Sequence, residues 1–178
     1  MKKDSEGFTL VELSVVLLII ALMATILIPN IGRLGGEDLR ESSRKIGGLI
    51  QYLYGLSTIQ KRNFYLNFDL DKGEYWVSVG KVNEEENSVE MIPYADDFVR
   101  KKYNLPSSVR VEDIDTVSNG KISEGRVTVT FYPEGFVDPV TIHFKNSSDD
   151  EMTLLVLPLT GDVRVYDGYK EITYVQQE

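Results

Sequence analysis

The sequence predicts an α+β protein in which one long N-terminal helix packs on an antiparallel β-sheet domain. Two observations carry this prediction. About the first 60 residues place apolar side chains at helical intervals, and later runs alternate apolar with polar residues between turns. The chain has 178 residues, 42% of them hydrophobic. Beyond its apolar N-terminal segment it therefore holds one ordinary domain of roughly 140 residues, able to bury its own core.

The first half of the predicted helix is an apolar run from Phe8 to Ile31 whose one charge is Glu12. At about 1.5 Å per residue, this run is long enough to cross a hydrocarbon core of about 30 Å. Because Lys2 and Lys3 precede it, the positive-inside rule places the N-terminus in the cytoplasm and the following domain outside. A secretory signal peptide is the alternative, but no small-x-small cleavage site follows the run.

The second half of the helix is predicted to be amphipathic and to end near Gln60. Pro29 lacks a backbone N–H and predicts a kink, and the pair Gly35-Gly36 allows a break. Beyond these residues the helical spacing defines one apolar face, which we expect to pack on the sheet. The apolar series consists of Ile46, Leu49, Ile50, Leu53, Leu56 and Ile59.

The strand-like runs follow the helix and are separated by short connections, which favours antiparallel neighbours. The predicted strands cover residues 63–68, 75–79, 109–114, 126–132, 140–145, 153–158 and 162–167. Residues 81–108 have no sustained period and contain charge runs, so they predict an irregular, solvent-facing insertion. Such an insertion could equally be a binding loop.

Residues that could hold a metal or perform catalysis are scarce. The chain has no cysteine and one histidine, His143, whose alternation with Ile142 and Phe144 places it on a polar strand face as a surface residue. Asp69-x-Asp71 begins like a calcium loop but lacks the later ligands, so it is interpreted as a solvated turn. No nucleophile, phosphate-loop or zinc motif occurs. We therefore expect no enzyme activity, no cofactor and no metal.

The charge balance disfavours nucleic acid as a partner. The formal net charge is −9, and residues 146–178 carry seven acidic and two basic residues, a net of −5. Every phosphate that a protein neutralises calls for Lys or Arg, so an acidic chain is a poor ligand for DNA.

Glu12 allows two interpretations from its position alone. A carboxylate within a membrane costs about 2.5–3.5 kcal/mol on insertion scales and usually has a partner. Alternatively, Glu12 lies at the headgroup level at little cost.

The residues Gly7 to Glu12, followed by the apolar run, resemble the prepilin leader of type IV pilins and pseudopilins. The resemblance implies that a prepilin peptidase cuts between Gly7 and Phe8 and that Phe8 is then N-methylated. It also implies that Glu12 pairs with the terminal amine of a neighbouring subunit during assembly. The fold implied is pilin-like.

The C-terminal pattern of Phe131, Pro133 and Gly135, with Thr160-Gly161 later, is similar to H-type minor pseudopilins of type II secretion and to the related T-type minor pilins. The absence of a C-terminal cysteine pair departs from typical major type IV pilins. The resemblance implies a minor pseudopilin, a structural subunit of the periplasmic filament. The alternative is a T-type minor pilin of a type IV pilus, acting in pilus assembly or DNA uptake. A third possibility is an anchored exported domain with a chance leader.

The expected organisation follows from these features. Residues 1–7 form the leader, 8–31 the transmembrane and filament-core helix, 32–62 its amphipathic continuation, and 63–178 a periplasmic antiparallel β domain. The expected location is the inner membrane, crossed once, with the C-terminal domain in the periplasm. The implied partners are other pseudopilins, the prepilin peptidase and the inner-membrane assembly platform.

Overall fold

The computed structural model describes residues 9–83 and 88–172, without the side chains of residues 24–35, 82, 83 and 88. The chain divides into two compact units, Met1–Leu34 and Gly35–Glu178. Within the described part of the chain, no helical stretch has the length and hydropathy that crossing a bilayer requires.

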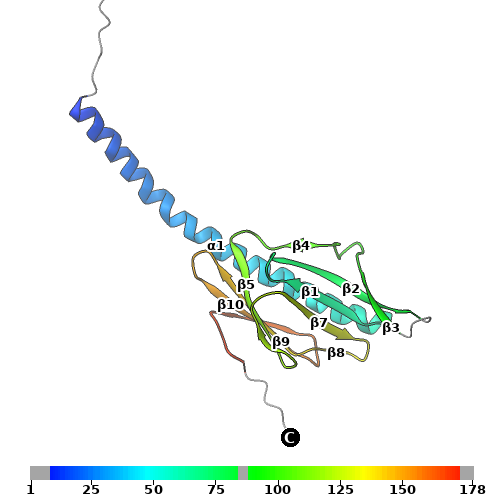
Figure 1. Ribbon diagram of the computed structural model, residues 1–178. Coiled ribbons are helices and arrows are strands. Elements are labelled where there is room, and N and C mark those ends of the chain that lie inside the picture. The colour runs from blue at the N-terminus through cyan, green and yellow to red at the C-terminus, as the bar shows by residue number, and fades with distance from the viewer. Residues whose placement is uncertain (1–8, 84–87, 173–178) are drawn as a thin grey trace, which may run out of the picture. The chain divides into compact units, whose positions relative to one another are not determined.

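Helix α1 spans Leu10–Gln60 (blue to cyan in Figure 1), and the helical backbone includes Gly35 and Gly36. The helix ends where Lys61 adopts a left-handed conformation, with φ of 56°. The N–H of Arg62 then bonds to the carbonyl of Ser57 at 3.3 Å, which closes the last turn. The predicted end of the helix at Gln60 is confirmed.

The first sheet is antiparallel and, in the described chain, has six strands in the order β3-β2-β1-β7-β8, with β4 paired to β2. Its strands are β1 (Phe64–Asp69), β2 (Glu74–Asn83), β3 (Ser88–Pro93), β4 (Tyr103–Asn104), β7 (Arg126–Tyr132) and β8 (Phe136–Val137). Strand β1 is central, and all six of its residues are buried. Its apolar residues therefore anchor this sheet in the core.

The second sheet is also antiparallel, with the described order β11-β10-β9-β5-β6. Its strands are β5 (Val109–Thr116), β6 (Gly120–Ile122), β9 (Val140–Asn146), β10 (Glu151–Val156) and β11 (Val163–Asp167). The register of β5 against β9 shifts between Val111 and Asp113. This β-bulge places Glu112 outside the regular pairing, and Asp113 then lies opposite His143.

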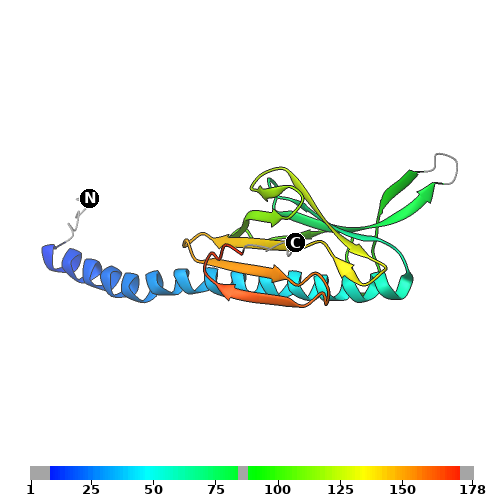
Figure 2. The same cartoon turned by 90° about the horizontal axis from the view of Figure 1, so that it is seen from below.

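Within the second unit, α1 and both sheets share one hydrophobic core (Figure 2). The helix contributes Leu39, Ile46, Leu49, Ile50 and Leu53, each 9% exposed or less. The approach of the helix to the second sheet depends on small residues. A Cβ at Gly47 would lie 3.2 Å from Val163, and one at Gly161, which has φ of 67°, would overlap the Tyr54 ring.

The α+β class with antiparallel sheets is confirmed, and four of its details differ from the sequence prediction. Residues 81–108 are not wholly irregular, because β2 extends to Asn83 and β3 and β4 lie in this region. The strands form two sheets, and β7 pairs with β1 and β8 rather than with β9. The connection after β7 contains β8. Ile59 is 80% exposed, because successive three-residue steps rotate it away from the buried face, which at this level carries the fully buried Ser57.

Candidate assembly site at the start of the helix

Glu12 lies in the first turn of α1, which local hydrogen bonds close. The Oγ1 of Thr9 accepts a hydrogen bond from the backbone N–H of Glu12 at 3.3 Å, and the Thr9 carbonyl accepts one from Leu13 at 3.1 Å. Thr9 thus acts as the N-cap residue, and the spacing Thr-x-x-Glu is that of a capping box. A carboxylate in this first turn is also favoured by the helix dipole.

The Glu12 side chain is exposed, and within the described residues its carboxylate contacts no Lys or Arg. Gly7 and Phe8, the predicted cleavage and methylation residues, lie outside the described residues. The structure therefore places the predicted assembly carboxylate at the helix start.

The apolar side chains around Glu12 are uncovered. From Leu10 to Met23 the large apolar residues are between 45% and 86% exposed, and they point to all sides of the helix. Next to Glu12, a shallow depression of about 320 Å³ is lined by Leu10, Val11, Ser14, Val15 and Leu18. A helix that is apolar all round is stable only when lipid or other protein covers it. This segment is therefore suited to a membrane or to packing between subunits.

The N-terminal residues match the family described as the prokaryotic N-terminal methylation motif, over residues 2–28. The search of curated proteins gave no match. The N-terminal segment is thus a prepilin-type methylation motif, which suggests anchoring in the inner membrane.

Solved structures with the same fold include two of the minor pseudopilin EpsH from the type II secretion system of Vibrio cholerae. One has a TM-score of 0.61 at 11% identity and covers 75% of this chain and 99% of that one. The other has a TM-score of 0.58 at 11% identity, covering 76% and 98%. The chain therefore has a pilin-like α+β fold. The motif and the fold are those of structural proteins, which agrees with the prediction that the chain is not an enzyme.

His143 is not a surface residue, and the prediction that placed it there is wrong. The residue is 2% exposed, because the segment after β11 crosses the outer face of the second sheet. The carbonyl of Lys170 accepts a hydrogen bond from His143 Nε2 at 3.0 Å, and Thr153 Oγ1 accepts one from the Lys170 N–H at 2.9 Å. These bonds cover the polar strand face that the sequence assigned to solvent.

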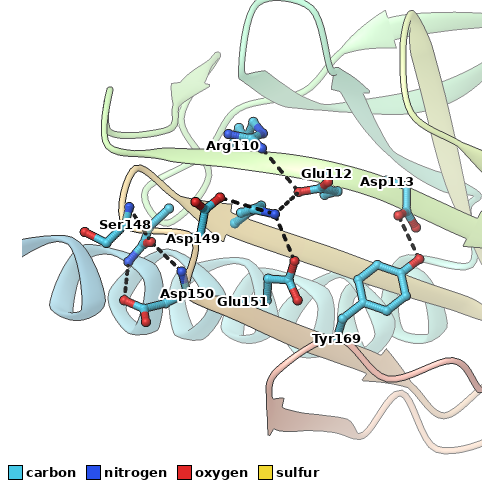
Figure 3. Close-up of polar contacts among 10 residues, drawn as sticks. Arg110, Glu112, Asp113, Ser148, Asp149, Asp150, Glu151 and Tyr169 are labelled. Carbon is cyan, nitrogen blue, oxygen red and sulfur yellow. Dashed lines mark hydrogen bonds and ion pairs between the residues drawn. The ribbon is translucent and has the colours of Figure 1, made fainter. Parts of the chain in front are cut away.

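A buried polar cluster forms around His143. The Nδ1 atom of His143 lies 2.6 Å from Asp113 Oδ1. The Tyr169 hydroxyl donates a hydrogen bond to the other oxygen, Asp113 Oδ2, at 2.9 Å, and Figure 3 shows this contact. The rings of His143 and Tyr169 stack with centroids 3.9 Å apart, and Lys121 lies over the Tyr169 ring. Both ring nitrogens of His143 therefore face oxygen atoms, Asp113 Oδ1 on one side and the Lys170 carbonyl on the other. The polar groups of this cluster are hydrogen-bonded to one another. The cluster therefore holds the segment after β11, which carries Tyr169 and Lys170, against the second sheet.

The acidic hairpin between β9 and β10 is also organised internally. Lys145 Nζ lies 3.1 Å from Glu151, 3.4 Å from Asp149 and 3.9 Å from Glu112 (Figure 3). The hydrogen bond to Glu151 is the largest cause that raises the pKa of Lys145, and it outweighs the opposing effect of desolvation. This cluster therefore stabilises the turn.

The two aspartates of the predicted solvated turn make contacts within the chain. Asp69 accepts the N–H of Lys72 at 3.2 Å and pairs with Arg126 at 3.3 Å. Asp71 accepts the N–H of Gly125 at 3.1 Å. Among the described residues, no group of three His, Asp or Glu side chains is placed to hold a metal ion. The aspartates join the β1–β2 turn to the start of β7.

Proposed function

We propose that this chain is a minor pseudopilin, a structural subunit of the periplasmic filament of a type II protein secretion system. The observation that carries the proposal is the methylation motif over residues 2–28, which leads into an uncovered apolar helix with Glu12 in its first turn. The EpsH-like fold of the chain supports the same function.

In this proposal the leader is removed before assembly. A prepilin peptidase cuts between Gly7 and Phe8, and the new terminus at Phe8 is N-methylated. Residues 8–31 then anchor the chain in the inner membrane, residues 32–62 continue the helix, and residues 63–178 form the periplasmic domain. The two lysines of the leader support this orientation, because the positive-inside rule keeps them in the cytoplasm.

Glu12 acts in assembly rather than in anchoring. Cleavage leaves a cationic amine on Phe8, four residues before Glu12 in the sequence. The Glu12 carboxylate pairs with the Phe8 amine of a neighbouring pseudopilin, which removes two costly charges from the membrane at once. The exposed state of Glu12, with no described Lys or Arg contact, supports this role. The partners are other pseudopilins and the inner-membrane assembly platform.

Variants at Gly7 and Glu12 test the proposal in cells. Gly7→Val should leave the leader attached, which intact mass and N-terminal sequencing of the membrane-extracted protein measure. Glu12→Ala and Glu12→Gln should be inserted and cleaved normally, yet lose crosslinks to other pseudopilins. Glu37→Ala is the matched control, because Glu37 is another exposed glutamate of α1.

Two outcomes would contradict the proposal. A mature chain that begins at Met1 or near Pro29 would exclude prepilin processing. Crosslinking of both Glu12 variants at the level of Glu37→Ala would leave Glu12 as an ordinary interfacial residue.

A further inference from the structure

A pocket of about 610 Å³ opens in the second unit between α1 and the chain around β4. Lys45, Gly48, Leu49 and Tyr52 line it from the helix, and Tyr75 lines it from β2. The chain around β4 contributes Phe98, Arg100, Lys102, Tyr103 and Asn104. Its volume lies within the range of about 300–1,000 Å³ that is typical of ligand sites. We refer to it as the aromatic pocket.

Aromatic rings form the walls of the aromatic pocket. Tyr75 and Tyr103 stack with centroids 4.8 Å apart and an interplanar angle of 3°, and Tyr52 lies against Phe98 at 5.7 Å. Phe98 is 79% exposed although it belongs to this cluster. Tyr and Trp, with Arg, are the residues that dominate binding at protein interfaces, so exposed aromatic rings beside a guanidinium favour recognition of a partner.

Of the three cations that line the aromatic pocket, the two lysines each pair with a carboxylate. Lys45 pairs with Glu41 at 2.6 Å, and Lys102 pairs with Glu74 at 2.7 Å. Within the described residues, the guanidinium of Arg100 pairs with no carboxylate. The backbone of Arg100 is nevertheless held, because its N–H donates to the Tyr103 hydroxyl at 2.9 Å.

The sequence places positive charge here against the trend of the whole chain. Arg100-Lys101-Lys102 is the one run of three consecutive cations in a sequence of net charge −9. A guanidinium binds a carboxylate through two parallel hydrogen bonds, and neighbouring rings accept an apolar side chain. Glu41 and Glu74 lie beside the paired lysines, which disfavours the dense phosphates of nucleic acid.

We propose that the aromatic pocket binds an acidic peptide segment of a partner protein. Arg100 pairs with a carboxylate of that segment, and an adjacent aromatic or aliphatic side chain enters between Tyr52, Tyr103 and Phe98. The site lies in the second unit and is independent of leader processing and of Glu12. A failure of this proposal would therefore leave the proposed function untouched.

The test is a binding titration on the full chain in detergent micelles. The probe is a fluorescein-labelled peptide, Glu-Phe-Glu-Glu-Phe, and its counterpart carries Gln in place of every Glu. Fluorescence anisotropy should show saturable binding of the Glu peptide that weakens with salt, and at least about tenfold weaker binding of the Gln peptide.

Two variants and their matched controls locate the binding. Arg100→Gln should weaken it by about tenfold or more, whereas Arg164→Gln, at an exposed arginine of β11, should leave it unchanged. Gly48→Leu should block the pocket, since a Cβ there meets nothing within 4 Å and the side chain extends into open space. Gly55→Leu is its control, at a similarly open helical glycine that does not line the pocket.

Several results would overturn the proposal. These are no binding of the Glu peptide, equal binding of the Gln peptide, or loss of binding in the control variants to the same extent. Tighter binding of a single-stranded oligonucleotide than of the Glu peptide, abolished by Arg100→Gln, would assign the pocket to nucleic acid instead.

Discussion

Asp96 shows how a single carboxylate orders the rim of the aromatic pocket. One oxygen accepts the backbone N–H groups of Phe98 and Val99 at 2.8 and 2.7 Å. The other accepts the hydroxyls of Tyr94 and Tyr52 at 2.8 and 2.9 Å. Through these hydrogen bonds, Asp96 links Tyr52 of α1 to the backbone of the segment that carries Phe98.

The same contacts set the pH dependence of this region. Desolvation raises the pKa of Asp96, but the hydrogen bonds from Val99, Tyr94, Phe98 and Tyr52 outweigh it, and the pKa is lowered below its usual range. A carboxyl whose pKa is lower in the folded state stabilises that state above its unfolded pKa, about 3.9 for Asp. That stabilisation is lost as the pH falls through the folded pKa.

We therefore predict that Asp96→Asn lowers the free energy of unfolding at pH 7, because the charge that its four hydrogen bonds favour is lost. The expected loss is only about 1 kcal/mol, because the side chain is exposed and solvent screens its interactions. The difference from the wild type should shrink as the pH falls through the folded pKa of Asp96, because the wild-type side chain then becomes neutral as well. Urea unfolding across an acidic pH series measures it. Asp97→Asn is the control, and a constant difference across the pH range would contradict the assignment.

Tyr75, which lines the aromatic pocket, has a pKa that is raised, in contrast to that of Asp96. Burial raises the pKa of Tyr75 to about 12, although the nearby Arg100 guanidinium lowers it in part. The phenol therefore stays neutral throughout the physiological range. The ring is available for packing and for contact with a ligand.

At the scale of elements, the amphipathic face of α1 was predictable because its burial depends on spacing alone. Ile46, Leu49, Ile50 and Leu53 recur at helical intervals, and each is buried against the sheets. Ile59 continues the same series but is 80% exposed. Each three-residue step rotates a side chain by about 60° relative to the buried face, so a run of such steps carries Ile59 out of it, while Ser57 stays buried.

This contrast gives a test of the helix phase. Leu53→Ala should lower the free energy of unfolding by about 2–5 kcal/mol, since Leu53 is completely buried and the change leaves a cavity. Ile59→Ala, one to two turns further on, should change it by less than about 0.5 kcal/mol. Chemical unfolding of both variants measures the difference. Similar losses in the two variants would mean that the buried face is misassigned.

The strand pairing and the His143 cluster were not predictable from local pattern. Alternation placed His143 on a polar face, and that face is indeed opposite to the core. However, the covering segment after β11 contributes backbone groups, such as the Lys170 carbonyl, that carry no sequence signal. The β-bulge that sets Asp113 opposite His143 also depends on pairing between distant strands. Such long-range contacts lie beyond single-sequence periodicity.

At the scale of the whole molecule, the two units differ in whether their apolar side chains are exposed or buried. The first unit exposes apolar side chains and carries Glu12, as suits a segment covered by lipid or by other subunits. The second unit buries its own core. The methylation motif was predictable because its residues are contiguous in sequence. The aromatic pocket was not, since its residues come from α1, β2 and the chain around β4.

The overall charge predicts how the chain behaves toward DNA, and this separates a pseudopilin from an uptake pilin. The net charge is −9, and residues 146–178 contribute −5. The acidic hairpin residues Asp149 and Glu151 share Lys145 as a counter-ion, which leaves little positive charge there for phosphate. A fragment lacking residues 1–32 should therefore show no measurable binding to duplex DNA at physiological salt. Electrophoretic mobility shifts across a salt series measure this. The same measurement on Arg100→Gln shows whether any DNA binding depends on the aromatic pocket. Sub-micromolar binding that weakens steeply with salt would favour the T-type minor pilin.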